Sequence, residues 1–218
     1  MRRFGGTSVL VFVASMAGLA ATAAAATNVA VWHMEESSGP MRDSGASPAN
    51  NGTIHGSVAR RAPGAIGKGY SFTRGWVSVP SHQSLNPSSR NITITLRLKP
   101  TSLPTSGDYD VIRKGDFPSQ FYKIELLQSG SVHCQFGGSE RVAAANSSKQ
   151  IKPNTGFHTI RCSKTGSQVM VSVDGSTTRR NVVIGSISNQ SPVVLGAYTG
   201  GTHGFFKGVM DEVNISIG

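Results

Sequence analysis

The strict alternation of apolar and polar residues in short segments constrains the fold more than any other feature of this chain. Between residues 92 and 99, ITITLRLK, every second residue is Ile or Leu and the residues between them are polar. Successive side chains of a β-strand point to opposite faces, so this period of two predicts a strand with one buried face. Pro100 ends the segment, because proline cannot donate a hydrogen bond within a paired strand. The same alternation runs through residues 157–175, where a turn at 164–167 predicts a hairpin.

Segments of this kind, separated by Gly, Ser, Asn and Pro, continue to the end of the chain, and no stretch has the periodicity of a helix. Besides the hairpin, the strands we expect cover residues 29–34, 76–79, 92–99, 109–113, 121–127, 131–136, 181–187, 192–195 and 208–217. Many short antiparallel strands joined by loops are typical of a sandwich or barrel. The one-sided alternation favours an all-β, two-sheet antiparallel sandwich in a single domain.

The first 26 residues have the features of a targeting segment. Arg2 and Arg3 precede an apolar run from residue 7 to about residue 20, and an alanine tract ending at Ala26 offers cleavage sites. This arrangement predicts a secretory signal peptide at 1–26, because the apolar run is short for a membrane span. We therefore expect a secreted, extracellular domain at 27–218 and no membrane insertion of the mature chain.

Cys134 and Cys162 are the only cysteines of the chain. An even pair in an exported protein most often forms a disulfide. Both cysteines lie on predicted strands, on the same side as neighbouring apolar residues, so we expect a structural disulfide between adjacent antiparallel strands. Two cysteines supply at most half of a zinc shell, which argues against a metal site here.

The mature segment has an excess of positive charge. Without Arg2 and Arg3, nineteen basic and eleven acidic residues give a formal charge of +8. Such a balance favours anionic partners, for example an acidic cell-surface polysaccharide, and a solvated, soluble surface is the alternative explanation. The basic residues are scattered, without interleaved stacking aromatics, which argues against nucleic acid.

The polar sides of the predicted strands offer a candidate binding face. If all the apolar sides share one core, the opposite side gathers polar residues that include Arg97, Lys123, His133, Gln135 and Arg161. The arginines can pair with uronate or phosphate oxygens, and the histidine and glutamine can bond hydroxyl groups. An ordinary solvated face of a sheet is the alternative.

Aromatic platforms for stacking against sugars are few. Trp32 and Trp76 lie within strand patterns, so we expect them in the core. Tyr109, Tyr122 and Tyr198 lie near strand ends and are better candidates for the rim of a binding site.

Several short motifs follow one another along the chain. They are WHMEESSG at 32–39, DSG at 43–45, NGT at 51–53, GAIGKGYSF at 64–72, WVSVP at 76–80, ITITLRLKP at 92–100, FHTIRC at 157–162, VVLGAY at 193–198 and FFKGVMDEVNI at 205–215. In this order they resemble the laminin G-like (concanavalin A-like) jelly rolls, although Leu96 and Phe157 replace the family's usual tryptophans and Thr159 replaces a histidine. The resemblance implies a jelly-roll sandwich with one of several roles: lectin, adhesion domain, carbohydrate-binding module, or an enzyme that cuts polysaccharide.

The resemblance also implies one structural Ca²⁺. Family members often hold it with an aspartate of the first loop and an aspartate of the closing strand, and these positions match Asp43 and Asp211. A hard cation takes oxygen ligands at about 2.3–2.6 Å, and loops rich in asparagine, glycine and backbone carbonyls complete such a shell. In the alternative interpretation Asp43 caps a turn through its own hydrogen bonds.

No catalytic constellation emerges from the sequence. The glycosidases that the resemblance brings in place two acidic residues at alternate positions of one strand, whereas Asp211 and Glu212 are adjacent and point to opposite faces. Asp108 and Asp110 do alternate, but beside Gly107 they look like a solvated turn. The Gly-x-Ser-x-Gly elbow of a serine hydrolase is absent.

The sequence thus predicts a secreted, non-catalytic domain that binds carbohydrate or a cell-surface polymer. A small secreted polysaccharide lyase or glycoside hydrolase is the rival function, and convergence of Arg97, Tyr122, His133 and Gln135 in one deep groove would favour it. An adhesion module for proteins is the third, and it requires a contiguous exposed apolar patch.

Overall fold

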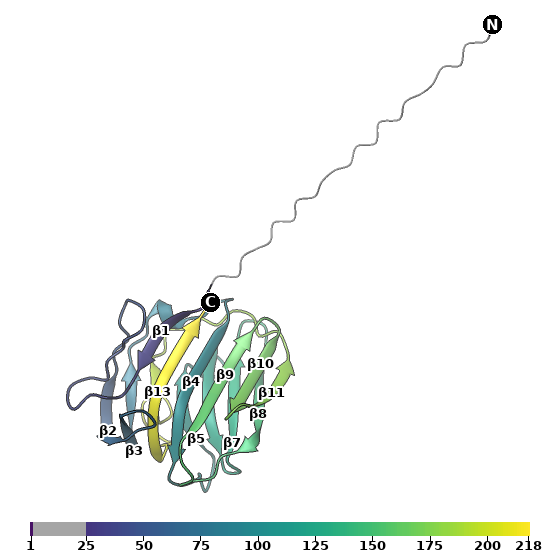
Figure 1. The fold of residues 1–218 in the computed structure, drawn as a ribbon. Coiled ribbons are helices and arrows are strands. Elements are labelled where there is room, and N and C mark those ends of the chain that lie inside the picture. Colours follow the sequence, from purple (N-terminus) through teal and green to yellow (C-terminus); the bar gives the residue numbers. More distant parts are fainter. Residues whose placement is uncertain (2–24) are drawn as a thin grey trace.

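The computed structural model describes residue 1 and residues 25–218, so the predicted signal peptide lies almost wholly outside the described residues. The described chain is built from β-strands with one short 3₁₀ turn, η1 (Gln83–Leu85), which confirms the all-β prediction (Figure 1). The strands are β1 (Thr27–Trp32), β2 (Thr53–Pro63), β3 (Lys68–Val79), β4 (Ile92–Pro100), β5 (Asp108–Lys114), β6 (Phe121–Leu127), β7 (Ser131–Gly137), β8 (Val142–Gln150), β9 (His158–Thr165), β10 (Gln168–Val173), β11 (Ser176–Asn181), β12 (Val193–Leu195) and β13 (Gly208–Ile217). Among these residues no helix has the length and apolar character to span a membrane.

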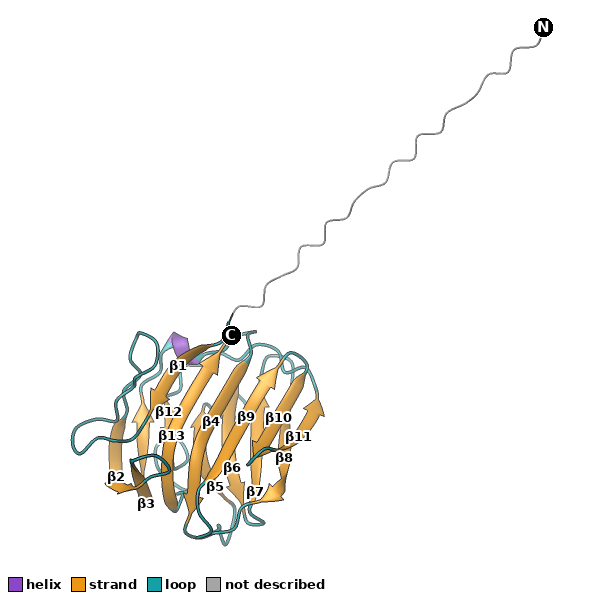
Figure 2. Ribbon diagram, in the orientation of Figure 1, coloured by secondary structure: helices purple, strands orange, loops and turns teal. Residues whose placement is uncertain are grey.

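The strands form two layers (Figure 2). The first sheet has the order β11-β10-β9-β4-β13-β1, and the second has the order β2-β3-β12-β5-β6-β7-β8, with antiparallel pairing throughout. The start of β13 also pairs with β3, where residues 208–210 lie beside residues 70–72, so the two layers are one continuous sheet folded over on itself. This architecture confirms the predicted antiparallel sandwich.

The alternation in the sequence becomes the inner and outer faces of each layer. Ile92, Ile94, Leu96 and Leu98 of β4 are buried, while the residues between them are half-buried on the outer face. Their counterparts on the second sheet include Ile124 on β6, and both sets belong to one hydrophobic cluster. Each fully buried aliphatic side chain of this size contributes about 1.5–3 kcal/mol, so this shared core is the main stabilising element.

The predicted disulfide is present between Cys134 on β7 and Cys162 on β9. The expectation that adjacent strands bring the two cysteines together is wrong, because β7 belongs to the second sheet and β9 to the first. Both side chains point inward, so the bond joins the two layers through the core instead of tying neighbours within one layer.

Four strands differ from the sequence-based expectation. β2 spans Thr53–Pro63, where only a short strand after the loop of residues 43–56 was expected, and β3 begins at Lys68 instead of Trp76. β8 was not expected, because its sequence VAAANSSKQ is poor in the β-branched and aromatic residues that favour strands. β11 lies at 176–181 instead of the expected 181–187, and its sequence STTRRN has no apolar side to signal its orientation. β8 and β11 are both edge strands: the Ser148 amide donates to the Thr178 hydroxyl at 3.2 Å, and Arg180 donates to the Ala144 carbonyl at 3.4 Å. These side-chain contacts cover edges that would otherwise be open to another chain.

Candidate functional site

The predicted binding residues do not share one face. Lys123 on β6 and His133 and Gln135 on β7 lie on the outer face of the second sheet. Arg97 on β4 and Arg161 on β9 lie on the outer face of the first sheet, with the hydrophobic core between the two groups. The assumption of a single polar face is therefore wrong, because strands with the same alternation were divided between two layers that face each other.

Two of the predictions for aromatic residues are confirmed: Trp32 was expected in the core and Tyr198 at the rim of a site. Trp32 is in the core, and Tyr198 is half-buried at a pocket. Trp76 is not in the core: it lies on the outer face of β3 and stacks on His55, with 4.9 Å between ring centroids. Tyr122 is wholly buried, and its hydroxyl donates to the Leu85 carbonyl, so it cannot line a groove. Tyr109 is also buried.

The outer face of the second sheet carries a pocket of about 410 Å³. Strands β5 and β6 form its floor, and the loop of residues 196–207 between β12 and β13 forms one wall. The ionisable and aromatic side chains that line it are Asp108, Asp110, Arg113, Asp116, Lys123, Glu125, Tyr198 and His203. Of the predicted binding residues, this pocket includes Lys123.

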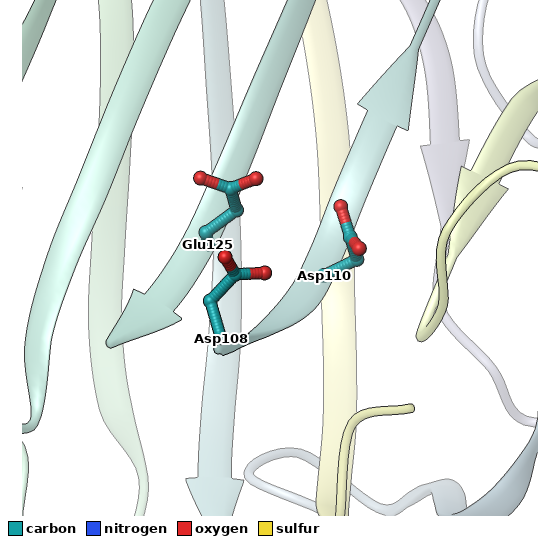
Figure 3. Close-up of side chains that lie close together, drawn as sticks. All are labelled: Asp108, Asp110 and Glu125. Carbon is teal, nitrogen blue, oxygen red and sulfur yellow. The ribbon is translucent and has the colours of Figure 1, made fainter. Parts of the chain in front are cut away.

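A bulge in β5 sets the floor of the pocket. Asp110 lies opposite Glu125 of β6, and the next register pair is Ile112 with Ile124, so Val111 is an extra residue in β5. The extra residue allows both Asp110 and Arg113, three positions apart, to point outward. Figure 3 shows Asp108 and Asp110 at the start of β5 and Glu125 on β6, and one oxygen of each lies within 4.8 Å of the others.

The loop of residues 196–207 is fixed to this floor by backbone contacts. The Asp110 amide donates to the Gly204 carbonyl at 2.9 Å, and the Tyr198 amide donates to the His203 carbonyl at 3.0 Å. The Tyr198 and His203 rings stack with 4.2 Å between their centroids. Gly201, at a φ of 65°, has the left-handed backbone that glycine adopts without strain, and a side chain there would meet the Trp76 ring.

Arg113 is the centre of the charge network, with 1% of its surface exposed. Its guanidinium pairs with Asp110 at 2.8 Å and with Asp116 at 2.8 Å. The Tyr198 ring covers the guanidinium at 4.0 Å, and the Tyr198 hydroxyl donates to Asp116. Because the cation is held between two carboxylates and an aromatic face, the Tyr198 ring has a fixed position at the mouth of the pocket.

The pKa shifts follow from this arrangement. Burial raises the pKa of Asp110 to about 7; the Arg113 guanidinium opposes this shift, while Glu125 and Asp108 add to it. Partial burial works to raise the pKa of Asp116, but the Tyr198 hydrogen bond and the Arg113 charge outweigh it and hold that pKa below its ordinary value. The hydrogen bond to Asp116 raises the pKa of Tyr198. The pocket therefore contains one carboxyl group that exchanges a proton near neutral pH.

Glu125 is paired with Lys123 at 2.5 Å and lies 4.0 Å from His133. The two cations of the pocket, Lys123 and Arg113, are therefore counter-ions for Glu125 and Asp110. Four carboxylates and two cations give the pocket an excess of acceptors with a few fixed donors. Such a set can accept a hydrogen bond from a hydroxyl group and also donate one to it.

This pocket was not expected from the sequence. Asp110 is only 1% exposed, so its interpretation as part of a solvated turn is wrong. The available signal was the pattern DYDVIR at 108–113, with two acids on the polar side of an otherwise apolar strand. Their approach to Glu125 and Tyr198 depends on strand pairing and on a loop distant in the sequence. Arg97, Tyr122, His133 and Gln135, whose convergence would have favoured the rival enzyme function, do not converge: Arg97 lies on the other sheet and Tyr122 is buried.

Asp43 and Asp211, the predicted calcium ligands, organise loops in the structure. The Asp43 carboxylate accepts from the amides of Val31, Gly45 and Asn50 at 2.7–2.8 Å. The Asp211 carboxylate, which is fully buried, accepts from the amides of Ala65, Ile66 and Glu212 at 2.8–3.0 Å. A carboxylate can accept about four hydrogen bonds, and the backbone amides use three of them on each side chain. About one acceptor position on each side chain is therefore left for a calcium ion. Calcium at this pair stays a prediction.

The family model described as the concanavalin A-like lectin/glucanases superfamily matches residues 72–217. No curated protein sequence matches the chain.

Solved structures with a similar fold include two toxin binding domains and one domain of an arabinanase. The binding domain of Paraclostridial Mosquitocidal Protein 1 is 16% identical over 87% of this chain, with a TM-score of 0.71. Domain 4 of AbnA, a GH43 extracellular arabinanase from Geobacillus stearothermophilus, in complex with arabinotriose, is 20% identical over 88%, with a TM-score of 0.66. The binding domain of Botulinum Neurotoxin DC in complex with SialylT is 10% identical over 87%, with a TM-score of 0.64.

The chain spans 93% of the arabinanase domain but 48% and 47% of the two toxin domains. At these identities the likeness establishes the fold alone. The family match covers two thirds of the whole sequence, and the matched residues include strands of both sheets. This chain is a member of the concanavalin A-like lectin/glucanases superfamily.

Proposed function

We propose that this chain is a secreted, non-catalytic carbohydrate-binding domain, and that the pocket between β5, β6 and the loop of residues 196–207 holds the sugar. The observation that carries the proposal is the fixed Asp110–Arg113–Asp116–Tyr198 network. It places buried charged groups beside the stacked Tyr198 and His203 rings at the mouth of a pocket, and His203 is the exposed ring of that pair. Sugars present hydroxyl groups at their edges and C–H groups on their faces, so they need this combination.

The structural neighbours support the same class of ligand. A complex with arabinotriose is recorded for the arabinanase domain, and a complex with SialylT is recorded for the neurotoxin binding domain. These ligands belong to those proteins. Because this chain has the same fold and spans nearly all of the arabinanase domain, we carry the ligand class over to it and leave the particular sugar open.

The charge of the pocket favours a neutral sugar. Even when Asp110 is protonated, three carboxylates outnumber the two cations, which already pair with Glu125 and Asp116. A uronate or sialate carboxyl group would therefore meet net repulsion here. The anionic polysaccharide that the sequence predicts as a partner does not suit this pocket.

Glycan binding to the purified chain tests the proposal. A glycan array identifies neutral ligands, and isothermal titration with arabinotriose and with the best array ligand gives affinities. Tyr198→Ala removes the ring that covers Arg113 and supports the exposed His203 ring, so we expect the affinity to fall at least tenfold. Phe157→Ala is the matched control, because it removes a half-buried aromatic ring from another part of the molecule. Absence of any neutral glycan signal, or equal affinities for the Tyr198→Ala variant and the unmodified chain, would contradict the proposal.

A glycoside hydrolase is the second candidate, and one observation favours it. Burial raises the pKa of Asp110 to about 7, which suits a general acid, and oxygens of Asp108 and Glu125 lie within 4.8 Å. Retaining glycosidases pair an acid with a carboxylate nucleophile at about 5–5.5 Å. Release of reducing ends from the polysaccharide of the best array ligand, lost in Asp110→Asn, would favour the enzyme. Binding without release favours the carbohydrate-binding domain.

A further inference from the structure

We propose that the outer face of the first sheet is a second binding surface, separate from the pocket, and that it takes an acidic polysaccharide through Arg97, Arg161 and Arg179. The shared chemistry of such ligands is a repeated carboxylate or sulfate group on a hydroxyl-rich chain. This surface lies on the opposite side of the core from the pocket, so one chain can hold two glycans of different charge.

The three arginines follow a diagonal line across the sheet. Arg161 on β9 lies beside Thr95, two residues before Arg97 on β4. Arg179 on β11 lies beside Met170, which in turn lies beside Ser163, two residues after Arg161. With strands about 4.8 Å apart and about 3.4 Å per residue, the successive Cα separations are about 8 Å and about 12 Å. Repeated acidic groups on an extended polymer can meet such a row in turn.

Within the described residues, the three arginines of this face have no carboxylate partner. The outward positions of β4, β9, β10 and β11 contain no Asp or Glu, and the ion pairs within the described residues involve none of the three arginines. Arg97 donates to the Thr159 hydroxyl at 2.5 Å, which fixes its direction. Two carboxylates of β13 lie near Arg97, and both are occupied: Glu212, which lines the same hollow, pairs with His33, and Asp211, opposite Arg97 in the register, accepts from three backbone amides. Asp174 pairs with Lys149 and His158.

Two hollows on this face contain polar atoms that lack a partner. One of about 350 Å³ is lined by Arg97, Thr95 and Asn214, among others, and the buried Oδ1 of Asn214 has no hydrogen-bond donor within the described structure. The other, of about 250 Å³, is lined by Arg161, Arg179 and Ser163. The Ser163 hydroxyl there is buried and has no hydrogen-bond partner among the described residues.

Buried polar atoms are normally paired, so each orphan atom points to an absent partner. Asn214 Oδ1 accepts, which suits a sugar hydroxyl, and the Ser163 hydroxyl can donate to a carboxylate or sulfate oxygen. Asn214, Thr95, Arg161, Ser172 and Thr177 form one row across β13, β4, β9, β10 and β11, and Ser163 lies on β9 two residues from this row. The residues that line these hollows include no Phe, Tyr or Trp ring to stack against a base, so their chemistry favours an acidic sugar polymer over a nucleic acid.

Binding of the purified chain to polygalacturonate and to dextran sulfate tests this proposal, with neutral dextran as the reference polymer. The two acidic polymers distinguish carboxylate from sulfate as the source of charge. The triple variant Arg97→Gln, Arg161→Gln, Arg179→Gln should lose at least tenfold in affinity for the acidic polymer that binds. The slope of log affinity against log salt should also become less steep, because fewer counterions are released.

A charge-matched control separates a specific surface from net charge. Arg61→Gln, Arg141→Gln, Lys152→Gln removes three charges from exposed positions on other elements and should leave the affinity within about twofold. Replacing the three arginines by lysines keeps the charge and should restore part of the affinity. Circular dichroism and a melting curve establish that each variant is folded.

Four outcomes would overturn the proposal. They are failure of both acidic polymers to bind, equal loss in the control triple variant, equally tight binding of single-stranded DNA, and loss of acidic-polymer binding in Tyr198→Ala. The last outcome would assign the polymer to the pocket. A failure of the pocket proposal leaves this surface unaffected, because its variants and its probes are different.

Discussion

Cys134 and Cys162 join β7 of the second sheet to β9 of the first, with their Cα atoms 5.7 Å apart. The bond lies inside the hydrophobic cluster, so it connects the two layers where pairing between strands does not. At the other side of the sandwich the layers are joined by backbone hydrogen bonds between β13 and β3. Each side of the core is therefore closed by a different kind of link.

Removal of this disulfide should destabilise the domain without changing its fold. The cysteines are 28 residues apart, and the loss of chain entropy in the unfolded state corresponds to about 3.5 kcal/mol. Guanidinium unfolding of Cys134→Ala, Cys162→Ala beside the unmodified chain, each with and without reductant, measures this difference. The double variant should not respond to reductant. An unfolding midpoint unchanged by the substitutions would contradict a structural role for the bond.

Lys114 should be essential to the loop that precedes β12. It is fully buried, and its ammonium group donates to the Asn189 carbonyl and side chain and to the Ser191 carbonyl at 2.9–3.0 Å. Lys114→Met fills the same space but leaves these acceptors without a donor, which should cost roughly 2–4 kcal/mol. Urea unfolding measures this loss of stability, with the exposed Lys152→Met variant as the control. Equal stability of the two variants would mean that water replaces the ammonium group.

The fold was predictable where one side of a strand is apolar. In β4 and β9 the alternation alone identifies the inward residues, and the structure buries them. It was not predictable at β8 and β11, because the inward side of β8 has only small residues (Ala143, Ala145 and Ser147) and β11 has no apolar side. Alternation also cannot tell which sheet a strand joins. For that reason Arg97 and Lys123 were placed on one face although they lie on opposite faces.

The candidate site was less predictable, because it depends on contacts distant in the sequence. Lys123 was expected at a binding face and does line the pocket, and Tyr198 was expected at a rim. Asp110 was not recognised, because its burial results from the loop of residues 196–207. That loop is held in place by stacking and backbone hydrogen bonds, which leave no periodic signal in the sequence.

Calcium, if it binds at Asp43 and Asp211 as the family resemblance implies, should raise the melting temperature. Calcium at 100 times its dissociation constant stabilises a folded protein by about 2.7 kcal/mol, or roughly 5–10 °C for a domain of this size. Melting curves in Ca²⁺ and in EDTA measure the difference, which Asp211→Asn should abolish. Identical curves for the unmodified chain would show that the two carboxylates serve only the backbone amides that they accept from.

The pH dependence of stability should report the buried Asp110. Burial raises its pKa from an ordinary 3.8 to about 7 in the folded chain. Between these values the unfolded chain has released the proton and the folded chain retains it, so stability falls as the pH rises from about 4 to about 7. At about 1.4 kcal/mol for each unit of pKa, the fall is at most about 4 kcal/mol.

Asp110→Asn removes the titrating group, although it also costs a pH-independent amount because Arg113 loses a partner. Its melting temperature, relative to that of the unmodified chain, should therefore increase steadily from pH 4 to pH 7 and become constant above that. The exposed Glu140→Gln is the control for loss of one carboxylate. A difference between Asp110→Asn and the unmodified chain that stays the same at pH 4 and pH 7 would mean that Asp110 is ionised throughout. Arg113 would then be the dominant influence on this carboxyl group, and the pocket would lose its candidate general acid.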